Sequence, residues 1–430
     1  MEGRRWQRVS ALRAVVIVAA LFAAGCTTGA GEDDDAARAP TGPSGSAGRF
    51  LPPVDLSGRY GGPEPLVAVG EDGAIWVAAQ DARGGAPHVW VSNDRGATFR
   101  ESRPTGVSGG EVDLAVGRGV AFVTQLGPGG NVVSYTRDQG RTWQQSTFAG
   151  TNYFERELVE IDERGSVYLL SRFGLRSIAG VQNEDATVAR SDDGGVTFVP
   201  VGRLWEAQRE PGSIIGNLVA DGPSLNAAYV CRDSTAICYA RSSDRGVTWT
   251  QSLVAQRAVD VANVYPIVAV AAGRVHVVWS DASDGRLAVW GATSVDAGAT
   301  WSPPQRVSEP GETATLPWIA TGGGRAWAVY LATDVALVEA GAAAAKDAAW
   351  LARAARLDDR LQVVERANVL PEPVHAGVIS KPVGRPGQGG PFDRSFGDFY
   401  TVAVGADGRA HVAVVRTVGG TATDLYVAER

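Results

Sequence analysis

The chain is poor in the residues and motifs that most often carry enzymatic chemistry. Its four histidines are scattered and do not have the spacing of metal ligands. It contains no Gly-x-Ser-x-Gly segment, no phosphate-binding P-loop and no catalytic Cys/His pairing. Residues 281–285 include two aspartates but lack the full ligand set of a calcium loop, so a plain hairpin turn is the favoured interpretation. The sequence therefore predicts neither a metal nor another cofactor.

Excess positive charge and long apolar runs are also missing. The formal net charge of −7 argues against a nucleic-acid partner. The apolar run near the N-terminus covers the eleven residues 14–24 and is too short to span a bilayer. Methionine occurs once, whereas glycine occurs 54 times, which fits a β protein rich in turns.

The N-terminal apolar run follows four arginines and ends at a cysteine, as in a bacterial export signal. Residues 21–26, Leu-Phe-Ala-Ala-Gly-Cys, resemble a lipobox with Ala23 where leucine is commoner. That resemblance implies cleavage before Cys26 and lipidation of its thiol, which anchors an exported protein to the outer face of the bacterial cell membrane. The alternative is an ordinary secretory peptide with a chance cysteine. We predict a signal peptide at 1–25, a flexible tether at 26–50 and a folded domain at 51–430.

The other two cysteines, Cys231 and Cys238, flank a short polar loop between two predicted strands. Opposed positions at the mouth of a hairpin lie close enough to bridge, and export permits oxidation. We therefore predict a disulfide. The alternative is a pair of buried thiols.

A short pattern, Ser/Thr-x-Asp-x-Gly-x-Thr followed by Trp or Phe, occurs five times, and we call each copy a box turn. Successive aspartates lie 44, 55, 51 and 52 residues apart. Such a period indicates stacked supersecondary units, most often propeller blades. In each copy the carboxylate can accept bonds from backbone N–H groups, the glycine permits a positive φ, and the aromatic ring can pack between sheets. The aspartates are Asp94, Asp138, Asp193, Asp244 and Asp296.

The box turns resemble the Asp-box (BNR) repeat of the sialidase superfamily, over roughly residues 60–430. The resemblance implies an all-β fold, a β-propeller, in which the box aspartates are structural and lie away from the catalytic site. Two further units lack the box, so seven blades are favoured and six are the alternative. An N-terminal strand near residues 50–56 would close the last blade, and the alanine-rich stretch 332–348 would hold a short helix.

Within each blade the strands A to D alternate in direction, so the A–B turns share a face with the box turns. The variable B–C and D–A loops lie on the other face, which we call the loop face, and binding usually depends on such loops. The loops contribute Arg172 and Arg176. We expect the binding site on this face, near the central channel where the A strands begin. Polar and aromatic residues at these positions are Glu64, Glu111, Arg156, Glu157, Tyr265, Trp318, Asp393, Arg394 and Asp398, and the loops also add Asp81, Arg83 and His375.

Sialidase activity itself requires a specific set of residues. Sialidases use three arginines to hold the sugar carboxylate, a tyrosine nucleophile with a glutamate partner, and an aspartate as acid/base. Here Pro63-Glu64-Pro65 stands where the family has Arg-Ile-Pro before the first blade. The remaining catalytic candidates by this resemblance are Tyr400, Glu157, Asp81, Arg83 and Arg394.

The sequence thus favours a lipid-anchored, extracytoplasmic, monomeric propeller that binds a cell-envelope glycan or a partner protein without catalysis. The alternative is a retaining exo-glycosidase of sialidase type. Fold alone does not decide between them, because propellers carry many unrelated functions.

Overall fold

The computed structural model describes residues 49–430, except for the segments 59–60, 82, 84, 105–109, 128–129, 150–154, 173–185, 206–211, 233–234, 258–264, 340–342, 380–394 and 419–421. Cys26, the predicted signal peptide and nearly all of the predicted tether lie outside the described residues. No helix of the described residues is long and apolar enough to cross a membrane.

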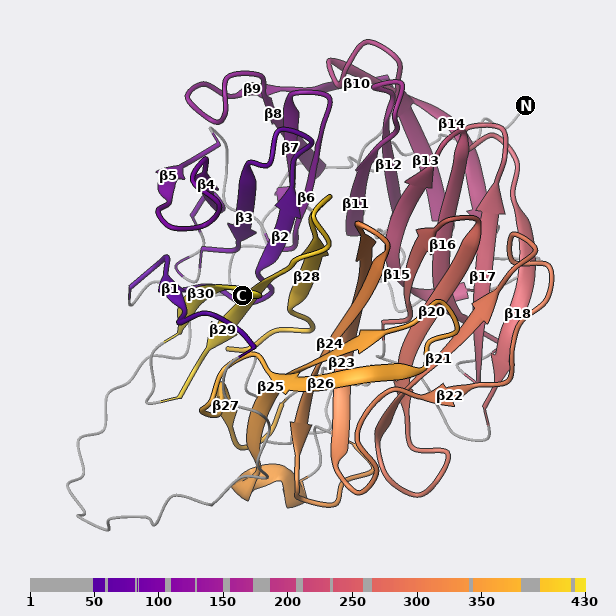
Figure 1. Ribbon diagram of the computed structural model, residues 1–430. Helices are drawn as coiled ribbons and strands as arrows, with labels where there is room; N and C mark the ends of the chain where they lie inside the picture. Colours follow the sequence, from indigo (N-terminus) through magenta and orange to yellow (C-terminus); the bar gives the residue numbers. More distant parts are fainter. Residues whose placement is uncertain are drawn as a thin grey trace, which may run out of the picture. The chain divides into compact units, whose positions relative to one another are not determined.

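Seven sheets form the blades of a β-propeller (Figure 1), and strands A to D follow chain order in every blade except the seventh, whose strand D is the N-terminal β1. Blade 1 comprises β2 (Leu66–Val69), β3 (Ile75–Ala79), β4 (His88–Ser92) and β5 (Arg100–Ser102). Blade 2 comprises β6 (Val112–Gly117), β7 (Val120–Gly127), β8 (Gly130–Thr136) and β9 (Gln144–Gln145). Blade 3 comprises β11 (Glu155–Ile161), β12 (Val167–Arg172), β13 (Ala186–Ser191) and β14 (Thr197–Trp205), with β10 (Thr147–Phe148) added in parallel at its outer edge.

Blade 4 comprises β15 (Gly212–Asp221), β16 (Ser224–Cys231), β17 (Ala236–Ser242) and β18 (Thr250–Gln256). Blade 5 comprises β19 (Ile267–Ala271), β20 (Arg274–Asp281), β21 (Ala288–Ser294) and β22 (Gln305–Arg306). Blade 6 comprises β23 (Thr313–Gly322), β24 (Arg325–Thr333), β25 (Ala349–Leu357) and β26 (Val363–Asn368), and β27 (His375–Ala376) pairs with β25. Blade 7 comprises β28 (Thr401–Val404), β29 (Ala410–Arg416), β30 (Thr423–Ala428) and β1 (Val54–Asp55).

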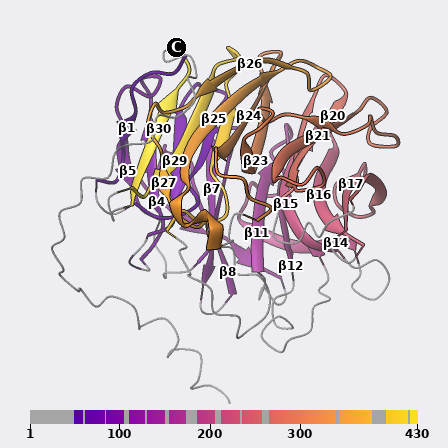
Figure 2. The same cartoon turned by 90° about the horizontal axis from the view of Figure 1, so that it is seen from below.

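The innermost strands form a closed ring of neighbours, in the order β2, β6, β11, β15, β19, β23, β28 and back to β2. Figure 2 shows β11, β15 and β23 on this inner side. The count of seven blades is therefore confirmed, and residues 349–368 form the outer half of blade 6 instead of an insertion. The expected short helix is also present, as the 3-10 helix η3 (Ala343–Asp347).

The N-terminal strand closes the ring, as the sequence predicts. In β1, Val54 pairs with Tyr426 and Asp55 with Leu425, and Phe50 forms a further bridge to Glu429. The Phe50 ring packs edge-on against Trp327 of blade 6, at 5.9 Å between centroids. Strands from the two ends of the chain thus form one sheet, blade 7 (Figure 1). This sheet closes the ring of blades.

The five box turns share one set of hydrogen bonds. In the first, Thr98 donates from its N–H to Asp94 Oδ1 at 2.9 Å and from its hydroxyl to Oδ2 at 2.5 Å. The hydroxyl of Ser92 donates to Asp94 and accepts from Gly96 N–H at 2.8 Å. The hydrogen bonds from Thr98 and Ser92 lower the pKa of Asp94 to about 2. These carboxylates thus bond to the backbone and side chains of their own turns, as a structural role would require.

Each box turn also contacts the preceding blade through packing and hydrogen bonds. In blade 5, Trp301 donates from Nε1 to Ser252 Oγ of blade 4 at 3.1 Å, and Ser252 donates to the carbonyl of Gly298 at 2.6 Å. Blades 1 and 2 repeat this joint with Trp143, Ser102 and Gly140. Gly298 has φ near 89° and lies directly against the Tyr239 ring of blade 4. The same residues that turn the chain therefore set the contact between neighbouring blades.

The two strand-connection faces lie where the sequence predicts. Arg245, in the fourth box turn, donates to the hydroxyls of Tyr168 and Ser166 at the A–B turn of blade 3, so both kinds of turn share one face. We call it the box face. The B–C and D–A connections, and the starts of the A strands, lie on the opposite loop face.

A buried carboxyl fastens the connection from β1 to blade 1. Asp424 in β30 is fully buried, and its Oδ2 accepts from Gly62 N–H at 3.2 Å. Burial, reinforced by the negative charge of Asp55, raises the pKa of Asp424 to about 8 in spite of the hydrogen bonds from Gly62 and Ser57. The carboxyl is therefore protonated at neutral pH in the folded protein.

A comparison of Gly298→Ala with Gly273→Ala should separate the stability that the inter-blade contact contributes from the cost of backbone strain. A Cβ at Gly298 would lie 2.1 Å from Tyr239 Cε1, whereas at Gly273 (φ near 76°) it would meet nothing within 4 Å. Gly273→Ala should cost about 1 kcal/mol for the left-handed backbone alone. Gly298→Ala should cost about 2 kcal/mol more in chemical unfolding, because the ring of Tyr239 must move. Equal losses for the two variants would contradict the joint.

Asp424→Asn should change how stability depends on pH. The folded pKa lies above the unfolded value, so unfolding of the wild type releases a proton between about pH 4 and pH 8 and its stability falls as pH rises. The asparagine variant loses this term, so its stability relative to the wild type should rise by up to about 1.4 kcal/mol per pH unit in that window. Thermal unfolding at pH 5 and pH 7.5 measures the difference. The exposed Asp347→Asn is the control, and a pH-independent difference for Asp424→Asn would refute the assignment.

Candidate functional site

Residues that lie in four A strands, or just before them, enclose a small pocket at the axis toward the loop face. A water-sized sphere can reach only about 10 Å³ of it, which is room for about one water molecule, so a larger ligand rests across its mouth and is not enclosed by it. Blades 2, 3, 6 and 7 contribute the lining, which consists of Glu111, Val112, Asp113, Glu157, Leu158, Trp318 and Phe399. We call this the axial pocket.

Aromatic rings form one wall of the axial pocket. The Trp318 and Phe399 rings pack at 5.4 Å between centroids, and Tyr265 meets Phe399 edge-on at 6.3 Å. Trp318 packs against the apolar cores between blades 1 and 2, blades 5 and 6, and blades 6 and 7. The half-buried indole therefore reaches across the axis from blade 6 while one side lines the pocket.

Irregular backbone places Trp318 there. The register between β23 and β24 shifts between Thr315 and Trp318, and Leu316 in this bulge has φ near 52°. A bulky residue with positive φ is strained, and bulges redirect side chains next to functional sites. The A strand β11 has a similar register shift between Glu155 and Leu158. Two strands that line the axial pocket thus depart from regular pairing at its mouth.

A chain of hydrogen bonds joins blades 1, 7 and 5 beside the pocket. Gln80 donates from Nε2 to Glu64 Oε2 at 2.7 Å, and Asp398 donates from its N–H to Glu64 Oε1 at 3.0 Å. Tyr265 donates from its hydroxyl to Asp398 Oδ2 at 2.9 Å. Glu64 has φ near 61°, and a Cβ on Gly397 would lie only 2.5 Å from Glu64 Cγ. This chain fixes Tyr265 in position at the rim.

Acidic side chains from blades 2 and 3 form the other wall. Asp113 Oδ2 accepts from Val159 N–H at 2.8 Å, which ties β6 to β11, and Glu157 is only 2% exposed. Further down β11, burial and the charges of Asp113 and Asp162 raise the pKa of Glu160 to about 8. The pocket therefore combines hydrogen-bond acceptors on one side with flat apolar rings on the other.

The structure brings several predicted site residues together at this mouth. Glu157 and Trp318 line the pocket, while Tyr265 and Asp398 lie at its rim. Sequence reasoning missed the role of Asp113. The signal available was one carboxylate within the apolar strand Val112–Gly117.

Other predicted site residues lie elsewhere. Tyr400 is fully buried between blades 6 and 7, where its hydroxyl donates to the carbonyl of Arg353 at 3.2 Å. Burial, with the adjacent Tyr330, raises the pKa of Tyr400 well above its ordinary value. His375 is 1% exposed and bonds Thr417. Neither side chain is placed to meet a ligand, because both belong to the packing between blades.

Asp81 and Arg83 form a salt bridge at the loop-face end of blade 1, with Arg83 Nε 3.1 Å from Asp81 Oδ1. Burial of Asp81 favours the neutral acid, but hydrogen bonds from Arg83 outweigh it, together with electrostatic attraction to His88 and Arg83, and the pKa of Asp81 is lowered to about 2. A carboxylate ionised so strongly is a poor proton donor at neutral pH.

Three predicted residues of the loop face lie outside the described part of the chain: Arg176, Asp393 and Arg394. The side chains of Arg156 and Arg172 lie outside it as well. Within the described part, no group of three or more His, Cys, Asp or Glu side chains is arranged to hold a metal ion.

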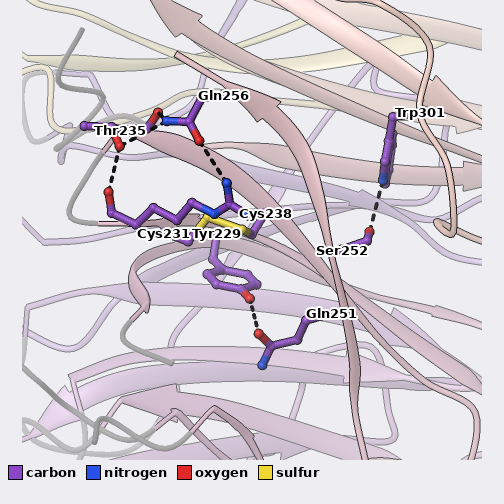
Figure 3. The surroundings of a disulfide bond; sticks show 9 residues. Tyr229, Cys231, Thr235, Cys238, Gln251, Ser252, Gln256 and Trp301 are labelled. Atoms are coloured by element: carbon purple, nitrogen blue, oxygen red, sulfur yellow. Dashed lines mark hydrogen bonds between the residues drawn. A yellow bond between two sulfur atoms is a disulfide. The ribbon is translucent and has the colours of Figure 1, made fainter. Parts of the chain in front are cut away.

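The predicted disulfide between Cys231 and Cys238 is present, with Cα atoms 5.9 Å apart (Figure 3). It closes the B–C hairpin of blade 4 on the loop face. Within this hairpin, Thr235 O accepts from Arg257 N–H at 2.8 Å and from Gln256 Nε2 at 3.0 Å. The carbonyl of Thr235 thus ties the end of β18 to the loop that the disulfide closes.

The sequence matches no family model and no curated protein. Among solved structures, an ulvan lyase of a new polysaccharide lyase family, bound to -[GlcA(1-4)Rha3S]-, aligns with TM-score 0.54 and 14% identity over 88% of this chain and 96% of that chain. A Hadza microbial sialidase aligns with TM-score 0.45 and 14% identity over 64% of this chain and 65% of that chain. An α-L-arabinanase from Penicillium chrysogenum, complexed with arabinobiose, aligns with TM-score 0.43 and 13% identity over 89% of this chain and 96% of that chain. The structural neighbours are thus sialidases and other propeller hydrolases and lyases, and the likeness to the lyase supports the propeller fold.

Proposed function

We propose that the chain is an exported Asp-box propeller of the sialidase superfamily, anchored by a lipid on Cys26, that binds a cell-envelope glycan in the axial pocket without cleaving it. The five box turns support the family assignment, and the charge of −7 fits a partner other than nucleic acid. The protein acts as a monomer and needs no cofactor.

The observation that carries this proposal is the pairing of acceptors and rings in one pocket. A sugar presents hydroxyl groups along its edge and C–H groups on its faces. Asp113 and Glu157 supply carboxylates for the hydroxyls, and Trp318 and Phe399 supply flat surfaces for a ring face. A protein partner needs a broader contact of at least about 1,000 Å² in total, whereas a single sugar ring laid across the mouth of the pocket needs only these few side chains.

The absence of catalysis is supported by the environments of two catalytic candidates. Tyr400 is shielded by blades 6 and 7, and Asp81 is held ionised by Arg83. A general acid needs a pKa close to the working pH, and a nucleophile needs access to the substrate.

A second candidate function, cleavage of a glycoside, is favoured by one contact. The half-buried Tyr265 donates its hydroxyl hydrogen bond to Asp398 at the rim of the axial pocket. A carboxylate beside a tyrosine hydroxyl can accept its proton and so activate the oxygen as a nucleophile. In this alternative the oxygen of Tyr265, and not of Tyr400, bonds to the anomeric carbon as the glycosidic C–O bond breaks. The departing alcohol takes the proton that Asp398 accepted, and water then hydrolyses the glycosyl-tyrosine.

Glycan binding should depend on the two walls of the axial pocket. An array of bacterial envelope oligosaccharides identifies ligands, and calorimetry then gives their affinities. Trp318→Ala and Glu157→Gln should each weaken binding by at least about tenfold, which corresponds to roughly 1.4 kcal/mol. Glu163→Gln, an exposed position at the A–B turn of the same blade as Glu157, is the matched control and should bind as the wild type does. Unchanged affinity in both pocket variants, with the fold intact by thermal unfolding, would exclude the axial pocket.

A panel of fluorogenic glycosides tests the second candidate. The proposed binding function predicts no turnover by the wild type. If turnover occurs, loss in Tyr265→Phe but not in Tyr400→Phe would establish the second candidate in place of the first. Tyr400→Phe should instead cost about 1 kcal/mol of stability, because it removes one buried hydrogen bond.

A further inference from the structure

The point where the chain enters the propeller determines which face lies next to an anchor. β30 is the third strand of blade 7, so it runs from the loop face to the box face and ends there at Glu429. Phe50 pairs opposite Glu429, and Arg430 donates from its N–H to the carbonyl of Arg49 at 2.9 Å. β1 then runs antiparallel to β30, back toward the loop face. The chain that precedes Arg49 therefore enters the propeller at the box face.

Charged contacts hold this point of entry in place. The side chain of Glu429 is buried, with the residue 1% exposed, and its Oε1 forms a salt bridge with Arg49 Nη2 at 2.5 Å. Arg409 donates from Nε to the backbone carbonyl of Glu429 at 3.1 Å. The Arg49 guanidinium also lies 5.8 Å from the ring centroid of Trp327 in blade 6. A side chain fixed by blades 6 and 7 together cannot swing to the other face without breaking the ring closure.

The axial pocket opens on the opposite face. Its lining includes Glu111 and Phe399, which come just before β6 and β28, and every A strand runs from the loop face to the A–B turns on the box face. The two faces are separated by the length of a strand. For β21, with seven residues, that length is about 23 Å at roughly 3.3 Å per residue.

We propose that the box face is the membrane-proximal face of the anchored protein, and that the axial pocket therefore opens away from the bilayer. This inference rests on the lipid anchor of the proposed function. Cys26 and Arg49 are separated by 22 residues, and the flexible tether that the sequence predicts there would have a root-mean-square end-to-end distance of about 26 Å. The tether is thus comparable to the height of a blade, which keeps the box face closer to the membrane on average than the loop face.

The orientation narrows the class of ligand. A pocket that faces away from the bilayer meets polymers that lie outside the membrane, such as wall or surface polysaccharides. Sugar headgroups of lipids in the same bilayer lie behind the box face and are poorly placed for it. The ligand is accordingly a polysaccharide or oligosaccharide that is not embedded in the anchoring membrane.

Energy transfer from single labelled cysteines to a membrane dye tests the orientation. The lipidated protein is reconstituted in phosphatidylglycerol/phosphatidylethanolamine vesicles that carry an acceptor on their headgroups. Two exposed pairs compare the faces within one blade. In blade 5 the pair is Val295→Cys on the box face and Ser283→Cys on the loop face, and in blade 2 it is Arg141→Cys and Gly110→Cys. The native cysteines do not compete for the label, because Cys231 and Cys238 are bridged and Cys26 is acylated in the proposed state.

In both blades the box-face label should show the higher transfer efficiency. Equal efficiencies, or higher transfer from the loop-face labels, would overturn the proposal. The Cys26→Ser variant should lose vesicle association and show no transfer, and retained association would refute the lipid anchor. The energy-transfer measurement uses no glycan. Its outcome therefore does not depend on whether the glycan array identifies a ligand. Thermal unfolding of each variant, matched to the wild type, verifies the fold.

Discussion

The joint between neighbouring blades is the contact on which the rest of the structure depends. A blade has a thin core of its own and is stable only against its neighbours. Each box turn contributes in two ways. Its aspartate accepts the hydrogen bonds that hold the turn, and its glycine and aromatic ring pack against the preceding blade. Where the box is missing, Leu361 in the C–D turn of blade 6 packs on Gly291 of blade 5, and Phe50 packs on Trp327. Every described joint therefore buries an apolar side chain, and the ring of seven follows from repetition of that contact.

Much of the fold could be predicted from the sequence because its determinants are local. The box turns, the spacing between them, the hairpin bridged by Cys231 and Cys238, and the N-terminal strand all depend on residues close in sequence or on simple strand alternation. Closure of blade 7 by residues 50–55 could be inferred because that blade lacks a fourth strand of its own.

The site could be predicted only in outline. The face and the channel mouth follow from strand direction, and Glu157 and Trp318 do line the pocket there. The position of each side chain does not follow, because a shift of one residue along a strand sends the side chain to the other side. Phe399 points to the axis, whereas the next residue, Tyr400, is buried between blades. The bulge at Leu316 has one signal in the sequence, because Pro317 cannot donate a strand hydrogen bond, but that proline does not reveal the direction of the Trp318 side chain.

A crystal structure of the protein soaked with a mixture of envelope oligosaccharides tests the central claim most directly, which is that the ring of blades creates a sugar site at the axis. We expect a sugar ring stacked on Trp318, with hydroxyl groups within about 3 Å of the carboxylates of Glu157 or Asp113. A sugar bound on the box face or along an outer strand, with the axial pocket empty in the same crystals, would contradict the account.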